Sequence, residues 1–300
     1  MEQENHFDVI IIGGSAAGLS AAMTLGRAMR NVLVIDCGTP CNLNTPHSHN
    51  FITNDGRPPA DILAKARKEI VAYETIGFVA EKAIAATCEG EFFAVVTSAD
   101  NKYLAKKILL CTGLSDVMPE ISGFAACWGN TILHCPYCHG WEVRTQPTGI
   151  LANGEAAYHL GVLIYNWTKD LTILTNGVSE LRNEEAEKLS ELGIKIVETE
   201  VARISHDCGK LKAVEFIDGT SFKPAVVYAS IPFQQQSDLA EQLGCKINPH
   251  GHIEIDDEQR ASIEGVYAAG DCTAQQRAVS VAAASGTKAG FTINLDLILR

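Results

Sequence analysis

The sequence has 300 residues, of which 46% are hydrophobic and 20% charged, which is enough for a full core and suggests about two domains. Its formal net charge of −12 argues against a nucleic-acid partner, because binding to phosphates depends on lysine and arginine. The acidic, polar opening does not resemble a signal peptide, and no apolar run reaches the length of about 18 residues that spans a bilayer, so we expect a cytoplasmic protein without a membrane partner.

The segment FDVIIIGGSAAGLSAAMTLGRAMRNVLVIDCG predicts a strand, a glycine turn, a helix and a second strand. The strands are the apolar runs Asp8–Ile12 and Asn31–Ile35. In such a unit Gly13 forms the tight turn, position 15 lets the backbone approach a pyrophosphate, and Gly18 lets the helix pack closely on the strand. Ser15 replaces the usual middle glycine with a small side chain, which should weaken this approach only slightly.

The start of this helix and the end of the second strand complete a dinucleotide-binding pattern. Free N–H groups at the helix start, near Ala16, can bind phosphate, and Asp36 is placed to accept hydrogen bonds from ribose hydroxyls. A glycine pattern with its strand, helix and terminal acid in place is a strong indication, and the alternative is a glycine-rich turn without a ligand.

Further along the chain, Pro59–Ile76 predicts an amphipathic helix, and Phe92–Thr97 and Ala105–Thr112 predict strands. The next segment, HCPYCHGWE at 134 to 142, holds two cysteines two residues apart between two histidines. Such side chains can hold a metal, cross-link the chain or pass electrons. The ten cysteines otherwise form no framework, and a reducing cytosol would keep most of them as thiols.

A second dinucleotide unit begins near Gly149, in GILANGEAAYHLGVLIYNWTKDLTILTNG, with Leu171–Leu174 as its second strand. Ala152, Gly154 and Ala157 stand at its three small positions. The first glycine has thus become alanine.

Charges near this second turn are unfavourable for a nucleotide. Glu155 could repel phosphate, and no arginine follows the second strand until Arg182. A 2′-phosphate is usually met by arginine forks, so a preference for NADPH cannot be argued. The alternative is an inherited fold that no longer binds nucleotide.

Near the C-terminus, Val266–Ala269 predicts a strand that ends at Gly270 and Asp271, followed by a helix over Arg277–Leu295. Asp271 is placed to accept hydrogen bonds from a sugar or ribitol chain, at the other end of a ligand seated on the first unit.

We therefore expect an α/β protein with two Rossmann-like dinucleotide-binding domains. The first domain is discontinuous, comprising residues 1–115 and 247–300, and the second, residues 116–246, is inserted into it and carries the C-x-x-C motif.

The order GGSAAG, CTG at 111–113, CPYC, a second dinucleotide unit and YAAGD resembles the low-molecular-weight thioredoxin reductase family over almost the whole chain. The CPYCHGWE segment is most similar to a branch that includes bacterial reductase-like proteins and dithiol oxidases of the holomycin and gliotoxin type. The resemblance implies FAD on the first unit, NADPH or NADH on the second, a redox disulfide, a homodimer and a domain rotation between half-reactions. It also makes Gly113, Gly270 and Ala278 candidate contacts to FAD.

By family position Cys138 lies nearest the flavin and Cys135 exchanges with the substrate. A C-x-x-C disulfide is small, accessible and readily reduced, and a cysteine at a helix start tends to have a lowered pKa. Inert thiols are one alternative. A zinc site of His134, Cys135, Cys138 and His139 is another, but its adjacent pairs are awkward ligands for one ion, so we expect no metal.

His139 departs from the family pattern, since typical members have an aspartate there as proton donor. Histidine exchanges protons near neutral pH, which favours a general acid/base role for His139, with His134 second. The alternative is two satisfied surface histidines. Gln276-Arg277 also departs from the usual arginine-glutamine order before the last helix.

The leading hypothesis is an FAD-dependent disulfide oxidoreductase that passes electrons from NADPH or NADH to the Cys135–Cys138 disulfide. Its acceptor is a thioredoxin-like protein or a low-molecular-weight disulfide. Alternatives are a dithiol oxidase that delivers electrons to oxygen, a reductase fed by ferredoxin or another flavoprotein, and a redox-sensing scaffold without enzymatic activity.

Overall fold

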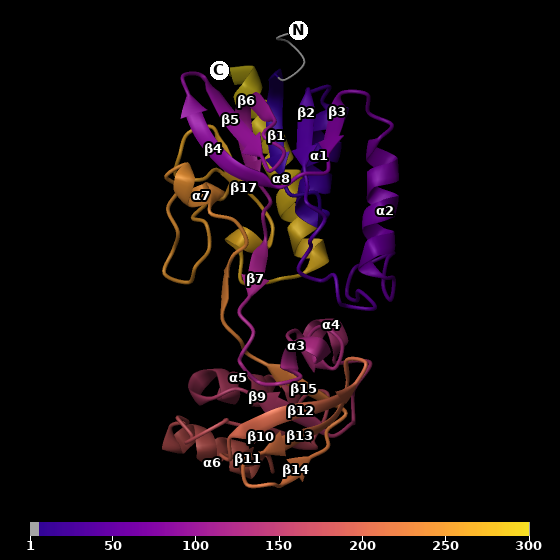
Figure 1. Ribbon diagram of the computed structural model, residues 1–300, viewed down its shortest axis with the longest axis vertical. Coiled ribbons are helices and arrows are strands. Elements are labelled where there is room, and N and C mark those ends of the chain that lie inside the picture. Colours follow the sequence, from indigo (N-terminus) through magenta and orange to yellow (C-terminus); the bar gives the residue numbers. More distant parts are fainter. Residues whose placement is uncertain (1–5, 300) are drawn as a thin grey trace. The chain divides into compact units, whose positions relative to one another are not determined.

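The computed structural model describes residues 6–299, and the contacts among its residues divide the chain into two compact units. Unit 1 comprises Met1–Leu43, Pro59–Ser115 and Phe233–Arg300, and unit 2 comprises Asn44–Pro58 and Asp116–Pro232. Each unit is built on its own parallel sheet (Figure 1).

The sheet of unit 1 has the strand order β3-β2-β1-β6-β5-β4, and β17 pairs with β6. Its strands are β1 (His6–Ile12), β2 (Val32–Ile35), β3 (Ile76–Val79), β4 (Ala83–Glu89), β5 (Phe92–Thr97), β6 (Lys102–Leu110) and β17 (Val266–Ala268). The pairs among β3, β2, β1, β6 and β17 are parallel, whereas β4 and β5 form an antiparallel extension. The β2 and β17 strands are buried along their whole length, as is typical of a parallel sheet covered on both faces.

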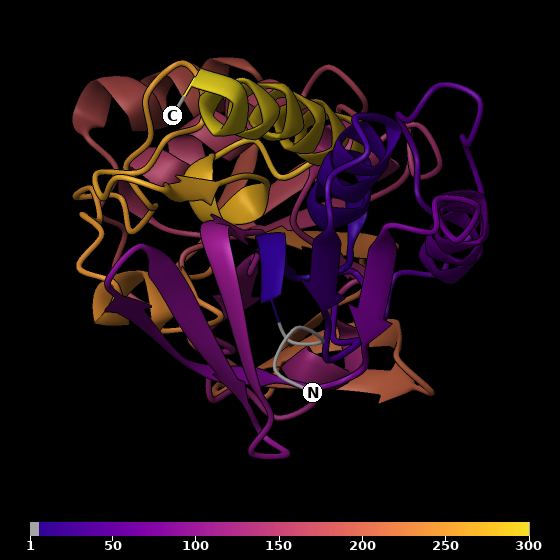
Figure 2. The same ribbon diagram turned by 90° about the horizontal axis from the view of Figure 1, so that it is seen from above.

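Helices α1 (Ala16–Arg27) and α8 (Val279–Leu299) lie side by side over this sheet (Figure 2). Small residues allow this close packing, because a Cβ atom on Gly286 would meet the carbonyl oxygen of Ala17 at 2.0 Å. The other helical segments of the unit are α2 (Pro59–Ile70), α7 (Leu239–Gln242) and the 3-10 turn Asp271–Thr273.

In unit 2 the parallel sheet has the order β11-β10-β9-β15-β8. Its strands are β8 (Ile132–Leu133), β9 (Thr148–Leu151), β10 (Leu171–Leu174), β11 (Lys195–Val197) and β15 (Val226–Ala229). A separate antiparallel sheet contains β12 (Val201–Asp207), β13 (Lys210–Phe216) and β14 (Ser221–Phe222). The helices are α3 (Phe124–Cys127), α4 (Pro136–His139), α5 (Gly154–Ile164) and α6 (Asn183–Glu191). Where the chain leaves unit 1 and returns to it, β7 (Leu114–Asp116) pairs with β16 (Phe233–Gln235).

The expected class, an α/β chain with two Rossmann-like parallel sheets, is confirmed by this arrangement. The helix predicted over 59–76 was too long, because it ends at Ile70 and Ile76 instead begins β3, opposite Val32 of β2. None of the helices in residues 6–299 combines the length and the apolarity needed to cross a membrane.

The unit boundaries differ from the predicted domain boundaries in two places. The segment before residue 247 belongs to unit 1 from Phe233 onward, since Leu239 and Cys245 are buried in that unit's core. Residues 44–58, which interrupt the first domain in sequence, belong to unit 2. Neither assignment has a local sequence signal, because both depend on contacts with distant residues.

Candidate functional site

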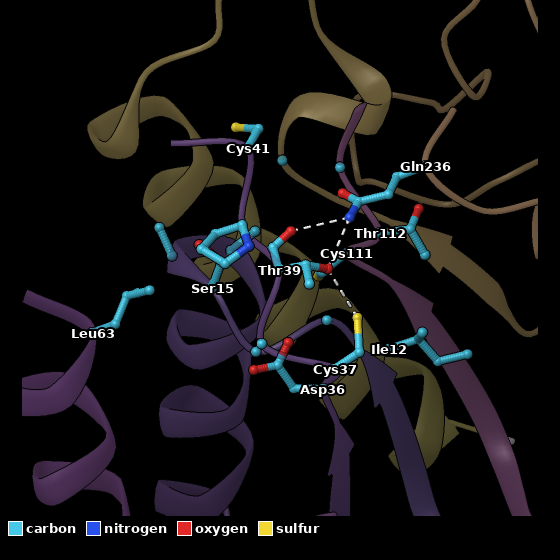
Figure 3. Close-up of a pocket in the computed structure, with 18 of the residues that line it drawn as sticks. Ile12, Ser15, Asp36, Cys37, Thr39, Cys41, Leu63, Cys111, Thr112 and Gln236 are labelled. Atoms are coloured by element: carbon cyan, nitrogen blue, oxygen red, sulfur yellow. Dashed lines mark hydrogen bonds between the residues drawn. The ribbon is translucent and has the colours of Figure 1, made fainter. Parts of the chain in front are cut away.

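A cavity of about 600 Å³ lies within unit 1, where β1, β2, β6 and β17 end (Figure 3). In open α/β sheets, ligands bind outside the carboxyl ends of the strands, and this cavity lies in that position. The sequence-predicted residues in its wall are Gly13, Ser15, Ala16, Asp36, Gly113, Gly270 and Asp271.

The turn between β1 and α1 is too crowded for larger side chains. Gly13 has a φ of 106°, and a Cβ atom there would lie 2.1 Å from the carbonyl oxygen of Cys111. A Cβ atom on Gly18 would lie 1.8 Å from the carbonyl oxygen of Gly13. Gly18 does not line the cavity, so its part is the close packing of helix on turn.

The N-terminus of α1 faces the cavity without a side-chain cap. Ser15 is the N-cap residue, but its hydroxyl makes no capping hydrogen bond, and no acidic residue stands in the first turn. The unpaired N–H groups and the positive end of the helix dipole therefore suit a phosphate group.

Asp36, at the end of β2, forms an ion pair with Arg67 of α2. Arg67 also donates a hydrogen bond to the carbonyl oxygen of Gly14, at 3.4 Å, so it ties α2 to the glycine turn. Sequence reasoning missed Arg67, because it resembles any other basic residue on the polar face of an amphipathic helix.

The loop after β2 closes another side of the cavity. Gln236 donates hydrogen bonds to the carbonyl oxygen of Thr39, at 3.0 Å, and to its hydroxyl, at 3.1 Å (Figure 3). The Cys37 sulfur lies 3.1 Å from the same hydroxyl. Two segments far apart in sequence are thereby joined at the cavity wall.

Asp271, which follows β17, also lines the cavity and contacts two side chains. The Cys41 thiol donates a hydrogen bond to it at 3.6 Å, and the Arg277 guanidinium lies 3.9 Å away. Cys41 is open to the cavity, yet the surrounding protein desolvates its thiolate, and this effect with the Asp271 charge raises the pKa of Cys41 to about 11. Ala278 does not line the cavity, whereas Ala282, one turn further along, does.

These residues fit FAD. The uncapped N-terminus of α1 can bind the pyrophosphate, and the carboxylates of Asp36 and Asp271 can accept hydrogen bonds from ribose and ribitol hydroxyls.

In unit 2, Cys135 and Cys138 form a disulfide with a Cα–Cα distance of 5.3 Å. Cys135 is the N-cap residue of α4, and its sulfur accepts a hydrogen bond from the Cys138 N–H at 3.1 Å. Both cysteines are half-buried, while Tyr137 between them is exposed. The disulfide is therefore held at the surface of this unit, at the start of a helical turn.

The structure brings His139 together with residues that the sequence did not connect to it. Its ring centroid lies 6.3 Å from that of His49, whose Nδ1 lies 3.6 Å from the Glu142 carboxylate. Burial lowers the pKa of His139, His49 lowers it further, and Glu142 opposes them. His139 is thus predominantly neutral at neutral pH, a state that can accept a proton.

His49 comes from the segment 44–58, and the pattern PHSHN was its only sequence signal. His134 lies on the exposed side of the motif, directly after β8. Within the described residues, no three His, Cys, Asp or Glu side chains come together as metal ligands.

The second dinucleotide unit is present as β9, α5 and β10. Ala157 is buried in the core against the sheet, and Gly154 begins α5 with a φ of 55°. Unlike α1, this helix is capped, because the Asn153 side chain accepts a hydrogen bond from the Gly154 N–H at 2.8 Å.

Comparison with known proteins agrees with this geometry. The profile of the family described as pyridine nucleotide-disulphide oxidoreductase matches residues 7–286. The thioredoxin reductase tcpT of Claviceps purpurea (strain 20.1) is 32% identical, over 99% of this chain and 96% of its own length.

Two solved structures show the same fold over nearly the full length. The putative thioredoxin reductase TrxB from Bacillus anthracis superposes with a TM-score of 0.93 and 34% identity, covering 97% of this chain and 98% of that one. The structure of HlmI gives a TM-score of 0.93 and 30% identity, covering 99% and 94%. The chain therefore belongs to the pyridine nucleotide-disulphide oxidoreductase family, whose members use FAD and a nicotinamide nucleotide, and within it to the thioredoxin reductase-like disulfide oxidoreductases.

Proposed function

We propose that this protein passes electrons from a nicotinamide nucleotide through FAD to the Cys135–Cys138 disulfide, and from there to a thioredoxin-like protein or a low-molecular-weight disulfide. The observation that carries this proposal is the surface disulfide at the start of α4, beside a predominantly neutral His139. When bound, FAD supplies the two electrons that reduce the disulfide.

The cavity residues hold this cofactor. The N–H groups at the start of α1, next to Ser15 and Ala16, bind the pyrophosphate. Asp36 accepts hydrogen bonds from ribose hydroxyls, and Asp271 accepts them from the ribitol chain. Gly113 and Gly270, which have positive φ angles, let the backbone approach the ligand closely.

Two electrons and one proton convert the disulfide to one thiolate and one thiol. Cys138 would receive the electrons that FAD supplies, as the family resemblance implies, and the Cys135 thiolate attacks the acceptor disulfide, forming a mixed disulfide and releasing one acceptor thiolate. The Cys138 thiolate then displaces the second acceptor sulfur and restores the starting disulfide. His139 exchanges protons with the two cysteines during these steps.

The surface around the disulfide suits an acceptor with apolar groups. Tyr137 and Trp141 are 64% and 66% exposed, and the Arg144 guanidinium stacks on the Trp141 ring at 3.8 Å. Exposed aromatic side chains next to a reactive sulfur supply contact area for docking at a low cost in conformational entropy.

A dithiol oxidase is the second candidate, because a neutral His139 can also serve the reverse direction of the same exchange. A base that is neutral at neutral pH can take the proton of a substrate thiol, so that its thiolate attacks the Cys135–Cys138 disulfide. The electrons would then leave through FAD to oxygen.

We also propose that the protein acts as a cytoplasmic homodimer. The exposed row Val281, Ala284, Lys288, Phe291, Leu295 and Ile298 on α8 alternates steps of three and four residues, the spacing of a helix packing seam. Phe291 and Ile298 are 64% and 63% exposed, so a second copy would remove large apolar side chains from water. Exposed free thiols such as Cys88 and Cys208 suit a reducing compartment.

Phe291→Asp should halve the mass measured by light scattering, and an unchanged mass would remove α8 from the interface.

Turnover of a disulfide by Cys138→Ser tests the central proposal. The variant should retain FAD and lose at least about a thousandfold in kcat with thioredoxin or a small aromatic disulfide, because no internal disulfide can form. Cys208→Ser, an exposed free cysteine, is the matched control and should keep full activity. Activity of Cys138→Ser near that of the control would refute the assigned electron path.

A further inference from the structure

The start of α5 is tied to the loop that follows β10, residues 175–181, by one side chain. The Asn153 carbonyl oxygen accepts hydrogen bonds from the N–H groups of Gly154 and Glu180, both at 2.8 Å. Its amide group donates to the carbonyl oxygen of Val178 at 2.9 Å. One of the N–H groups that a pyrophosphate would use is therefore already paired.

Two carboxylates stand at the same helix start. A Cβ atom built on Gly154 would lie 3.8 Å from a carboxylate oxygen of Glu180, and Glu155 is in the first turn of α5. These negative charges interact favourably with the positive end of the helix dipole, and they would repel a phosphate group. The N-terminus of α5 is thus already stabilised by the carboxylates of Glu155 and Glu180.

The same loop offers no cation to a 2′-phosphate. Thr175 donates its hydroxyl proton to backbone carbonyl oxygens, and Asn176 accepts a hydrogen bond from the Val201 N–H at 2.7 Å. Arg182 is paired with the buried carboxylate of Glu185 at 2.6 Å. Residues 175–181 contain neither lysine nor arginine.

We propose that Asn153 and Glu180 form a latch over the N-terminus of α5, which a nicotinamide nucleotide must displace, and that the cation-free loop makes NADH the preferred nucleotide over NADPH. This inference rests on the proposed function, because it names the electron donor of the same enzyme. The latch weakens the binding of both nucleotides, because both contain the pyrophosphate. The loop weakens only the binding of NADPH, which carries the additional 2′-phosphate.

Calorimetric titration of the FAD-loaded protein with NADH and with NADPH tests the latch. Wild type should bind NADPH at least about tenfold more weakly than NADH. Glu180→Gln removes the charge and keeps the backbone hydrogen bond to Asn153, so it should tighten both nucleotides by about three- to tenfold. Glu187→Gln, an exposed charge on α6 outside the latch, is the matched control and should change neither.

A second variant tests the loop separately. Val178 is 82% exposed and only its carbonyl group joins the latch, so Val178→Arg adds a cation without removing a hydrogen bond. It should tighten NADPH more than NADH. Wild-type binding of NADPH as tight as that of NADH, or equal responses of Glu180→Gln and Glu187→Gln, would overturn the inference.

Equilibrium binding also separates this inference from the proposed function. Nucleotide affinities in the expected order without disulfide turnover would contradict the proposed function alone. Turnover with NADPH at affinities unaffected by Glu180→Gln would contradict the latch alone.

Discussion

The helices α1 and α5 begin two units of the same design, yet they present opposite chemistry at their N-termini. The start of α1 has no side-chain cap and no acidic residue in its first turn, and it faces a cavity. The start of α5 is capped by Asn153 and faced by Glu155 and Glu180. The difference shows that a strand-turn-helix unit can keep its fold while the groups that bind a nucleotide change, so function has to be argued from the helix start.

The glycines of the two turns differ in the same sense. Cβ atoms on Gly13 and Gly18 would meet backbone oxygens at 2.1 and 1.8 Å, whereas alanine stands at both corresponding positions of unit 2, Ala152 and Ala157. The tight turn that admits a pyrophosphate is therefore maintained in unit 1 and relaxed in unit 2.

Substitutions of the glycines in the two turns should give the largest difference in FAD binding between the two units. Gly18→Ala forces α1 away from the β1 turn and should lower the FAD bound per chain by at least about tenfold, or about 1.4 kcal/mol in binding free energy. Gly154→Ala, at the middle small position of the unit 2 turn, should leave the FAD content unchanged. The flavin-to-protein absorbance ratio after purification measures both, with circular dichroism as the check on folding. A fully flavinylated Gly18→Ala protein would contradict the assignment of this turn to FAD.

Removing Arg67 should have a moderate effect on the same site. Arg67→Ala leaves Asp36 without its ion pair and frees the carbonyl oxygen of Gly14, so the FAD affinity of the apoprotein should fall by about three- to tenfold. Arg182→Ala breaks the comparable ion pair in unit 2 and should not change the FAD affinity. Quenching of flavin fluorescence gives both affinities, and equal losses in the two variants would show that the effect is not specific to the cavity.

The smallest expected effects concern proton binding by His139. Burial and His49 lower its pKa, so NMR should show its ring titrating below the usual value of about 6.5. His49→Gln should raise this pKa, and Glu142→Gln should lower it further. The pKa of His139 is lower in the folded state than in the unfolded state. Its contribution to the free energy of unfolding is therefore fully present above the unfolded-state pKa and is lost as the pH falls toward the folded-state pKa. A titration above 6.5, or shifts of the opposite sign, would remove the electrostatic basis for His139 as a proton acceptor.

Local patterns were enough to predict much of the fold. Leu171–Leu174 was predicted with its observed bounds, because a short apolar run between polar residues is typical of a buried parallel strand. The helix over 59–76 was overextended, since Val71 and Tyr73 continue an apolar pattern that pairing of β3 with β2 overrides.

The candidate site was predictable only where it is local in sequence. Gly13 and Asp36 follow directly from the strand-turn-helix pattern. Arg67, His49 and Glu180 reach their sites through contacts across long stretches of chain, and no spacing rule could assign them. Glu155 is evident in the sequence as a charge near the turn, but the hydrogen bonds of Asn153 at the same helix start reach a loop more than 20 residues away.

An anaerobic reductive titration of the purified flavoprotein tests most directly whether the Cys135–Cys138 disulfide exchanges electrons with FAD. Dithionite should deliver four electrons per chain to wild type, two for the flavin and two for the disulfide, and only two to Cys138→Ser. Full reduction of wild type by two electrons per chain would show that the disulfide takes no part in the flavin's redox chemistry and would contradict the account.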